Sequence, residues 1–316
     1  MSTTNFHALG PRVKRALPTT ALLGALALLS GCKSVALGFA ADAAAGTSDN
    51  YARDDDPQLV RDAVPFGLKT MEGVLDGKPK HEGLLTGLAS GFTQYGFAFV
   101  QTDADLDDLD GRLEQSRAER ERARKLYARA REYGLRGLDV RRDGLGAKLR
   151  RGGADALKAL AGAEKGDVPL LYWTAAAWTL GIAANKGDMG AIAELPTPVA
   201  MMERALALDE AWGDGAIHEF FVSYDATRTA AEGGGPDRAK AHLERVNVLS
   251  MNKKLGPRVS FAEGILVQQQ HRDEFVRVLE EVVRADPGAV PRYRLANLIA
   301  QRRAKALLAH VDDLFL

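Results

Sequence analysis

Helix-breaking residues punctuate the chain after residue 57, and their spacing constrains the fold more than any other feature. Between the breaks alanine and leucine are frequent, whereas alternating runs of β-branched residues, which predict strands, are scarce. The breaks, rich in glycine and proline, lie at residues 77–79, 166–169, 196–198, 233–236, 256–257 and 286–288. The sequence therefore predicts a single all-α domain over residues 57–316. The expected helices span about residues 57–76, 83–101, 106–133, 138–150, 153–163, 169–186, 197–208, 212–228, 236–249, 257–270, 272–285 and 290–311.

Four of the expected helices share a short phrase: a small or apolar residue, a second four positions later and a third three positions after that. This phrase resembles the second helix of a tetratricopeptide repeat, and its third positions lie 75, 41 and 36 residues apart. The pattern predicts degenerate tetratricopeptide-like helix pairs in an α-solenoid, with generic amphipathic helices as the alternative. The phrases are Ala123–Tyr127–Ala130, Pro198–Met202–Ala205, Ala239–Leu243–Val246 and Phe275–Leu279–Val282.

Two segments, residues 83–102 and 168–185, contain no charged side chain. Each approaches the length of a membrane span, but glycine, threonine and aromatic residues interrupt both, which argues against one. We expect helices buried on all sides, or helices that line an internal cavity closed by the solenoid. Phe92 and Tyr95 in the first segment, with Trp173 and Trp178 in the second, are the candidate lining residues.

The first 31 residues are typical of a bacterial export signal. Arg12, Lys14 and Arg15 form a basic start, and an apolar run over residues 17–29 is too short to span a bilayer. Without this segment the chain keeps 39 basic and 42 acidic residues, so it lacks the positive charge that nucleic-acid binding favours.

The signal ends in Leu-Ser-Gly before Cys32, the only cysteine of the chain. This resembles the lipobox of bacterial lipoproteins and predicts cleavage before Cys32 and lipidation of its thiol. Lys33 follows, and the absence of aspartate there favours the inner leaflet of the outer membrane. We expect residues 32–56 to be the lipidated N-terminus and a flexible tether, because they are rich in alanine, glycine and serine.

No complete catalytic motif is present. His218 and Glu219 begin like a zinc-binding H-E-x-x-H helix, but Val222 stands where the second histidine is required. The chain also lacks G-x-S-x-G and a P-loop. We therefore expect no enzymatic activity, no cofactor and no metal.

An acidic stretch beginning at Asp103 mimics a calcium-binding loop. Asp103, Asp105, Asp107 and Glu114 match ligand positions, but Asp108 replaces the required glycine. A solvated acidic helix start, ahead of an arginine-rich run of alternating charge, is the favoured interpretation.

Beyond these patterns, the chain resembles the TatT component of tetratricopeptide-protein-associated TRAP transporters, which are periplasmic lipoproteins of bacteria. The resemblance covers residues 57–316 and departs where Ala306 replaces an expected tryptophan. It rests on residues 87–95 (GLASGFTQY), 126–138, 171–178 (LYWTAAAW), 215–220 (GAIHEF), 256–263 (GPRVSFAE) and 312–315 (DDLF).

The resemblance implies helix pairs around a cavity, a homotrimer, and docking with a periplasmic solute-binding protein, TatP. Through that partner a hydrophobic or organic-acid ligand would reach a TRAP permease. The competing hypothesis is a membrane-anchored scaffold that assembles envelope proteins and binds no small ligand. For the cavity and its mouth, the candidate residues are Phe92, Tyr95, Trp173, Trp178, His218, Phe221 and Tyr224.

Overall fold

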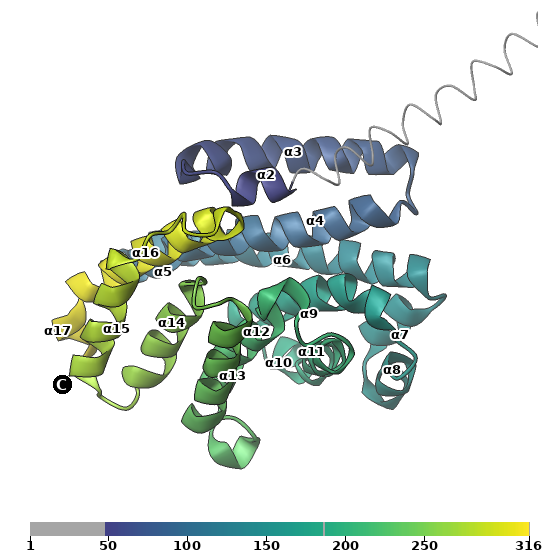
Figure 1. The fold of residues 1–316 in the computed structure, drawn as a ribbon. Coiled ribbons are helices and arrows are strands. Elements are labelled where there is room, and N and C mark those ends of the chain that lie inside the picture. The colour runs from purple at the N-terminus through teal and green to yellow at the C-terminus, as the bar shows by residue number, and fades with distance from the viewer. Residues whose placement is uncertain (1–47, 186, 316) are drawn as a thin grey trace, which may run out of the picture. The chain divides into compact units, whose positions relative to one another are not determined.

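The computed structural model describes residues 48–185 and 187–315, and within these ranges it contains helices and no strands (Figure 1). The all-α prediction is confirmed. The expected signal peptide, Cys32 and residues 33–47 of the tether lie outside the described residues.

The α-helices and the short 3₁₀ and π segments (η) follow the breaks closely. They are α2 (Ser48–Ala52), α3 (Pro57–Gly77), α4 (Glu82–Tyr95), η1 (Gly96–Gln101), α5 (Thr102–Leu109), α6 (Leu113–Arg141), α7 (Leu145–Arg151), α8 (Gly153–Leu160), η2 (Lys165–Asp167), α9 (Val168–Ala183), α10 (Met189–Ala193), α11 (Pro196–Leu208), η3 (Trp212–Asp214), α12 (Ala216–Ala226), η4 (Ala230–Glu232), α13 (Pro236–Leu249), α14 (Gly256–Phe261), η5 (Ala262–Leu266), α15 (Arg272–Arg284), η6 (Pro291–Tyr293), α16 (Arg294–Ala309) and α17 (Val311–Leu314).

The four repeated phrases mark buried positions. Every residue of the phrases on α6, α11 and α15 is buried, and on α13 only Leu243 is partly exposed. The spacing read from the sequence therefore identifies the faces of these helices that pack inward. Closure into a solenoid around a cavity remains a prediction.

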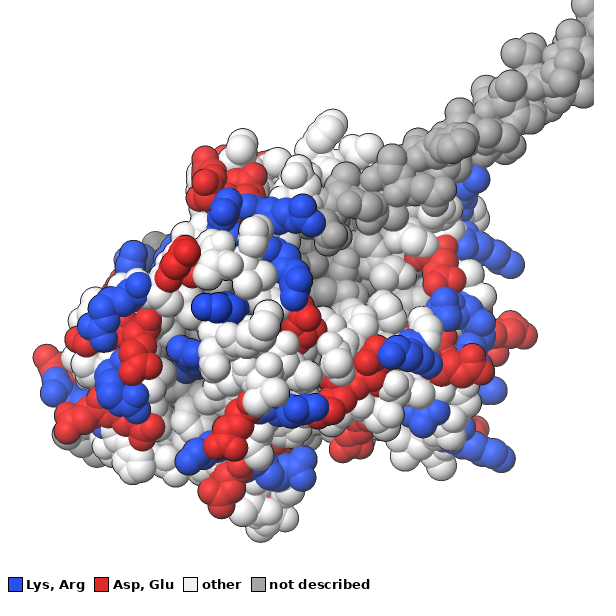
Figure 2. Space-filling view, in the orientation of Figure 1, with Lys and Arg blue, Asp and Glu red and all other residues white. Residues whose placement is uncertain are grey.

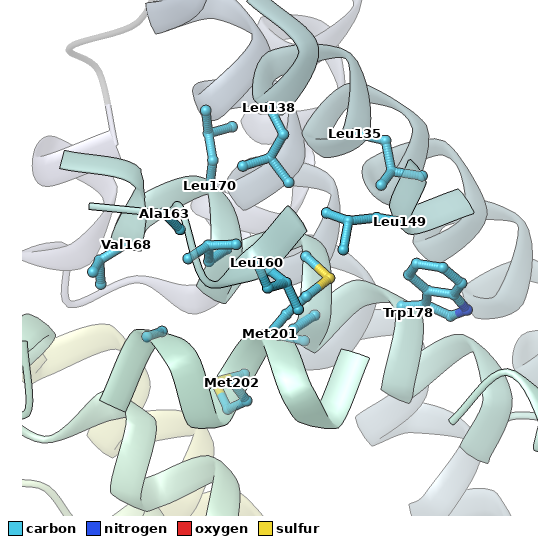
Figure 3. Packing of buried hydrophobic residues seen from close by; sticks show 14 of the residues in the cluster. Leu135, Leu138, Leu149, Leu160, Ala163, Val168, Leu170, Trp178, Met201 and Met202 are labelled. Atoms are coloured by element: carbon cyan, nitrogen blue, oxygen red, sulfur yellow. The ribbon is translucent and has the colours of Figure 1, made fainter. Parts of the chain in front are cut away.

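The two uncharged segments form central helices, α4 with η1 and α9. Helix α9 packs against α4, α6 and α11, and nine of its residues are buried. Figure 3 shows Leu170 and Trp178 of α9 in a cluster with Leu135, Leu138 and the methionines of α11. Among the described residues, no helix has both the length and the hydropathy needed to cross a membrane.

Close contact between α6 and α9 depends on two glycines of α6. A Cβ atom at Gly134 would lie 2.1 Å from the hydroxyl oxygen of Thr174, and one at Gly137 would lie 2.6 Å from Leu170. Helix α6 consequently continues to Arg141, past the end expected at residue 133, because these glycines serve packing rather than termination.

The acidic stretch forms helix α5, separated from α6 at Gly111, whose φ is +74°. Asp108 and Asp110 are exposed, as expected of a solvated helix start, whereas Asp103 and Asp105 are largely covered by arginines of other helices. Asp103 pairs with Arg61 of α3 and Arg302 of α16, at 2.5 and 2.7 Å. Asp105 accepts a hydrogen bond from Arg303 of α16 at 2.8 Å.

The second half of this network lies on α16 and η5. Arg303 also donates two hydrogen bonds to Glu263, at 2.7 and 2.8 Å. Together these contacts join α3 and α5, early in the described chain, to η5 and α16 near its end. On the face shown in Figure 2, basic and acidic side chains are interspersed in the same way.

Helix α2 lies within the stretch expected to be a tether. The carbonyl of Arg53 accepts a hydrogen bond from Arg294 at 3.1 Å, and Tyr51 packs against the cluster of α3 and α4. The described body therefore starts before residue 57.

Candidate functional site

The aromatic residues expected to line one cavity are divided between two hydrophobic clusters. Phe92 and Tyr95 belong to the cluster formed by α3, α4, η1 and α6. Trp178 and Phe221 belong to the cluster of α6, α9, α11 and α12, and Tyr224 packs against it. These side chains therefore do not surround a common space.

Phe92 and Tyr95 pack against other rings of their cluster. Phe92 stacks on Tyr133, with ring centroids 6.1 Å apart, and the guanidinium of Arg129 lies 5.3 Å from the Phe92 ring. Tyr95 contacts Phe99 at 5.6 Å. Burial, reinforced by a hydrogen bond from Tyr133 to Glu72, raises the pKa of Tyr133 to about 12. These contacts assign both predicted residues to the core.

Trp178 is also enclosed. Its Nε1 donates a hydrogen bond to Glu194 at 2.8 Å, and the guanidinium of Arg131 lies 4.8 Å from the indole ring. Arg131 in turn pairs with Glu194 at 3.1 Å. The ion pair of Arg131 and Glu194 therefore covers the indole ring of Trp178.

Two surface hollows, of about 410 and 460 Å³, are lined mainly by charged side chains, and neither includes a predicted cavity residue. The first is lined by Asp103, Leu106, Asp107, Asp110, Arg112, Glu119, Arg302 and Ala306, and the second by Arg117, Arg120, Glu121, Arg124, Ala184, Asn185 and Asp188.

His218, Phe221 and Tyr224 come together on α12, around His242 of α13. The Nδ1 atoms of His218 and His242 lie 2.7 Å apart, and the ring of Phe221 stacks on His242 at 5.0 Å. Tyr224 contacts Phe221 at 6.2 Å and lies below the guanidinium of Arg228. This is the one group of predicted residues that the structure assembles.

A carboxylate stands at each end of the histidine pair. His218 Nε2 lies 3.1 Å from Glu210, and His242 Nε2 lies 3.6 Å from Asp225 Oδ2. Arg245 holds Glu210 through two hydrogen bonds of 2.6 and 2.9 Å. Asp225 is 1% exposed, and its Oδ1 has no hydrogen-bond partner.

The geometry fixes most of the protons. An ionised Glu210 only accepts, so His218 carries its proton on Nε2, and its Nδ1 accepts from Nδ1–H of His242. A neutral His242 then presents a bare Nε2 toward Asp225. The Oδ2 atom of Asp225 on that side also accepts a hydrogen bond from Arg238 at 3.4 Å.

The pKa values follow from the same arrangement. Burial, with the nearby charges of His218 and Arg238, lowers the pKa of His242 to about 4. Burial raises the pKa of Asp225, although Arg238 acts in the opposite direction. The Arg245 hydrogen bonds, against a smaller effect of burial, lower the pKa of Glu210 to about 2. Burial therefore favours the uncharged form of both His242 and Asp225.

Trp173 lies apart from this group, in a partly exposed aromatic cluster with Tyr172 and Trp212. The ring centroids of Tyr172 are 4.9 Å from Trp173 and 4.6 Å from Trp212. Glu219 and Lys254, paired at 3.3 Å, provide charges beside it, and burial raises the pKa of Tyr172 with a contribution from Glu219. The cluster offers flat apolar rings next to fixed charges, which suits a protein partner or an organic ligand.

Sequence reasoning found His218 but missed His242, Asp225 and Glu210. A helical period groups residues of one helix, whereas His242 lies 24 residues away on another. Within the described residues, no set of three or more histidine, cysteine, aspartate or glutamate side chains is arranged to hold a metal ion.

Comparison with known proteins gives two findings. The family model of the TRAP transporter T-component matches residues 53–315. An uncharacterized protein of Treponema pallidum (strain Nichols) is 28% identical over 267 residues, which cover 84% of this chain and 82% of that protein.

Proposed function

Because the chain belongs to the TRAP transporter T-component family, we propose that it is the accessory component of a TRAP-type solute uptake system and docks with a periplasmic solute-binding protein. The observation that carries the proposal is the extent of the family match, which takes in almost all of the described helices.

The proposed location is the periplasm, with a lipid anchor at Cys32 in the inner leaflet of the outer membrane. The motif before Cys32 supports this, and the family match begins only at residue 53, after the expected signal and most of the tether. Two or more acyl chains hold a protein on a membrane far more durably than one.

In this proposal the body acts by binding rather than catalysis, as a homotrimer that binds its partner and a small hydrophobic or organic-acid ligand. The polar groups near the predicted residues are tied to one another: Glu194 to Trp178, and Glu210 to Arg245 and His218. Such groups suit a rigid binding surface better than a nucleophile that must be free to react.

The contact surface we propose for the partner is the cluster of Tyr172, Trp173 and Trp212. Partly exposed tryptophan and tyrosine are the residue types that dominate interface energies, because they bury a large area at little entropic cost. The buried Trp178, in contrast, is a poor place to test docking, since its replacement would disturb the core.

Calorimetry with a TRAP-type periplasmic solute-binding protein from the same organism tests the proposal. We expect binding at micromolar concentrations or tighter, weakened at least tenfold by Trp173→Ala. The matched control is Phe97→Ala, which removes a 45% exposed ring from η1 and should leave binding unchanged.

Two results would count against the proposal. Absence of association at tens of micromolar would leave the membrane-anchored scaffold as the better hypothesis. Association that Trp173→Ala leaves intact would keep the transport role and exclude this surface. Native mass spectrometry of the gently purified protein tests separately for a retained organic ligand.

A further inference from the structure

Helix α3 carries two large apolar side chains on the side that faces away from the core. Leu59 is 58% exposed and Phe66 is 78% exposed. They lie seven residues, or two turns, apart, so they share one face of the helix. The opposite face is buried through Val60, Leu68 and Met71.

The polar groups on this outer face form hydrogen bonds within the helix. Gln58 donates to both carboxylate oxygens of Asp62, at 3.1 Å each, and Lys69 pairs with Glu72. The hydroxyl of Thr70 donates to the carbonyl of Phe66 at 2.9 Å. Because Gln58 is neutral, Asp62 keeps its charge and stays at the level of the lipid headgroups, whereas the side chains of Leu59 and Phe66 can reach the boundary with the acyl chains.

The position of α3 leaves this face open. The helix packs against α4 through its inner side, and Figure 1 shows it as the outermost layer above α4, with no described helix over its outer side. An amphipathic surface helix with bulky apolar residues on its free face is suited to the boundary between lipid headgroups and acyl chains.

We propose that the outer face of α3 inserts its Leu59 and Phe66 side chains into the bilayer that holds the lipid anchor. This inference rests on the lipidation of Cys32 in the proposed function. Fifteen residues, 33–47, separate Cys32 from α2, and even fully extended they span about 50 Å. The anchor thus keeps α3 near the membrane at a high effective concentration, where a weak insertion suffices.

The size of the face favours a bilayer over a second copy of the chain. The exposed apolar surface of Leu59 and Phe66 together is on the order of 300 Å², whereas each partner of a standard protein interface buries about 800 Å². A small apolar contact that would be too weak for free association becomes effective when an anchor supplies the proximity.

The experiment uses the full chain, lipidated in a bacterial host and reconstituted into vesicles of phosphatidylethanolamine and phosphatidylglycerol. Cys32 is the only native cysteine, and a lipidated thiol does not react, so Phe66→Cys can be labelled uniquely with an environment-sensitive nitrobenzoxadiazole dye. Val248→Cys, from a 65% exposed site on α13, is the matched control.

We expect the dye on the Phe66→Cys variant to be quenched by lipids that carry a nitroxide on the acyl chain. Its quenching by aqueous iodide should be at least threefold weaker than for the Val248→Cys variant. A Leu59→Cys variant should behave like Phe66→Cys, which guards against an effect peculiar to one substitution.

Equal iodide quenching at the two sites overturns the inference. So does protection of the dye that depends on protein concentration and persists in detergent without vesicles, because a second copy then covers the face. If the unsubstituted chain takes up dye at Cys32 or fails to float with vesicles, the proposed anchor has failed, and this inference falls with it.

Discussion

Two polar clusters join separate helices of this protein, and they differ in how completely their charges are matched. On α5, Asp105 faces Arg303, which also holds Glu263. Between α12 and α13, the carboxylate of Asp225 is enclosed with an imidazole and leaves Oδ1 without a partner. The first cluster consists of matched fixed charges, whereas the second holds a poorly compensated carboxyl group beside two histidines, so they should respond differently to substitution and to pH.

The largest expected effect comes from removing the shared cation of the first cluster. Arg303→Met keeps much of the side-chain volume but leaves Asp105 and Glu263 facing each other without their common partner. We expect a loss of about 3 kcal/mol in the free energy of unfolding, measured with urea at pH 7. Arg272→Met, which breaks the exposed pair with Asp312, should cost less than about 0.5 kcal/mol. Similar losses of unfolding free energy in the two variants would show that the network around Arg303 stabilises the fold no more than an exposed ion pair does.

The second prediction concerns acidification. A histidine whose pKa is lower in the folded than in the unfolded protein binds fewer protons when folded, so acid favours unfolding. With the pKa of His242 at about 4 and an unfolded value of about 6.5, stability should fall from pH 6.5 toward pH 4.5. The full loss, complete only near pH 4, is at most about 3 kcal/mol.

The matched variant is His242→Phe, which retains an aromatic ring against Phe221. Between pH 6.5 and pH 4.5, its free energy of unfolding should change by less than half as much as that of the unsubstituted protein. The remaining pH dependence comes from His218, because burial also lowers the pKa of that residue. Glu210 adds its own loss only below pH 4.5, because its pKa is lowered, and the raised pKa of Asp225 opposes the trend at the acid end. Parallel pH profiles for the two proteins would rule out the histidine pair as the source.

The smallest expected effects come from one substitution, aspartate to asparagine, made in each of the two clusters. Asp225 is buried beside His242 and its ion pair with Arg238 is long, at 3.4 Å, so Asp225→Asn should change stability at pH 7 by less than about 1 kcal/mol. Asp105→Asn removes a negative charge from Arg303 and Arg120, and should cost about 2 kcal/mol. Chemical denaturation measures both variants, and equal costs would mean that the two carboxylates are equally well compensated.

The sequence predicted the helices well because breaks and apolar spacing are local signals. It failed where the same residue type has two uses. A helix was expected to end at residue 133, but α6 continues through Gly134 and Gly137, which permit α9 to approach through Thr174 and Leu170.

The candidate site was predicted less well, because its contacts are long-range. His218, Phe221 and Tyr224 were named only as members of a larger cavity set, and their common position on α12 beside His242 of α13 is a finding of the structure. The cavity role given to Phe92 and Tyr95 rested on their lack of charged neighbours in sequence, which is equally true of core residues. Nothing in the order of residues indicates that Asp105 meets a side chain nearly 200 positions later.

That last contact has a consequence for how the protein reaches its native state. Asp105 and Arg303 are separated by 198 positions, so a chain that emerges N-terminus first displays Asp105 long before Arg303 exists. Such distant pairing is characteristic of slow folding, and it exposes intermediate states to aggregation. A chain truncated before α16 would lack the ion pairs that Arg302 and Arg303 supply to α5, so α5 gains its full set of ion pairs only after α16 has been synthesised.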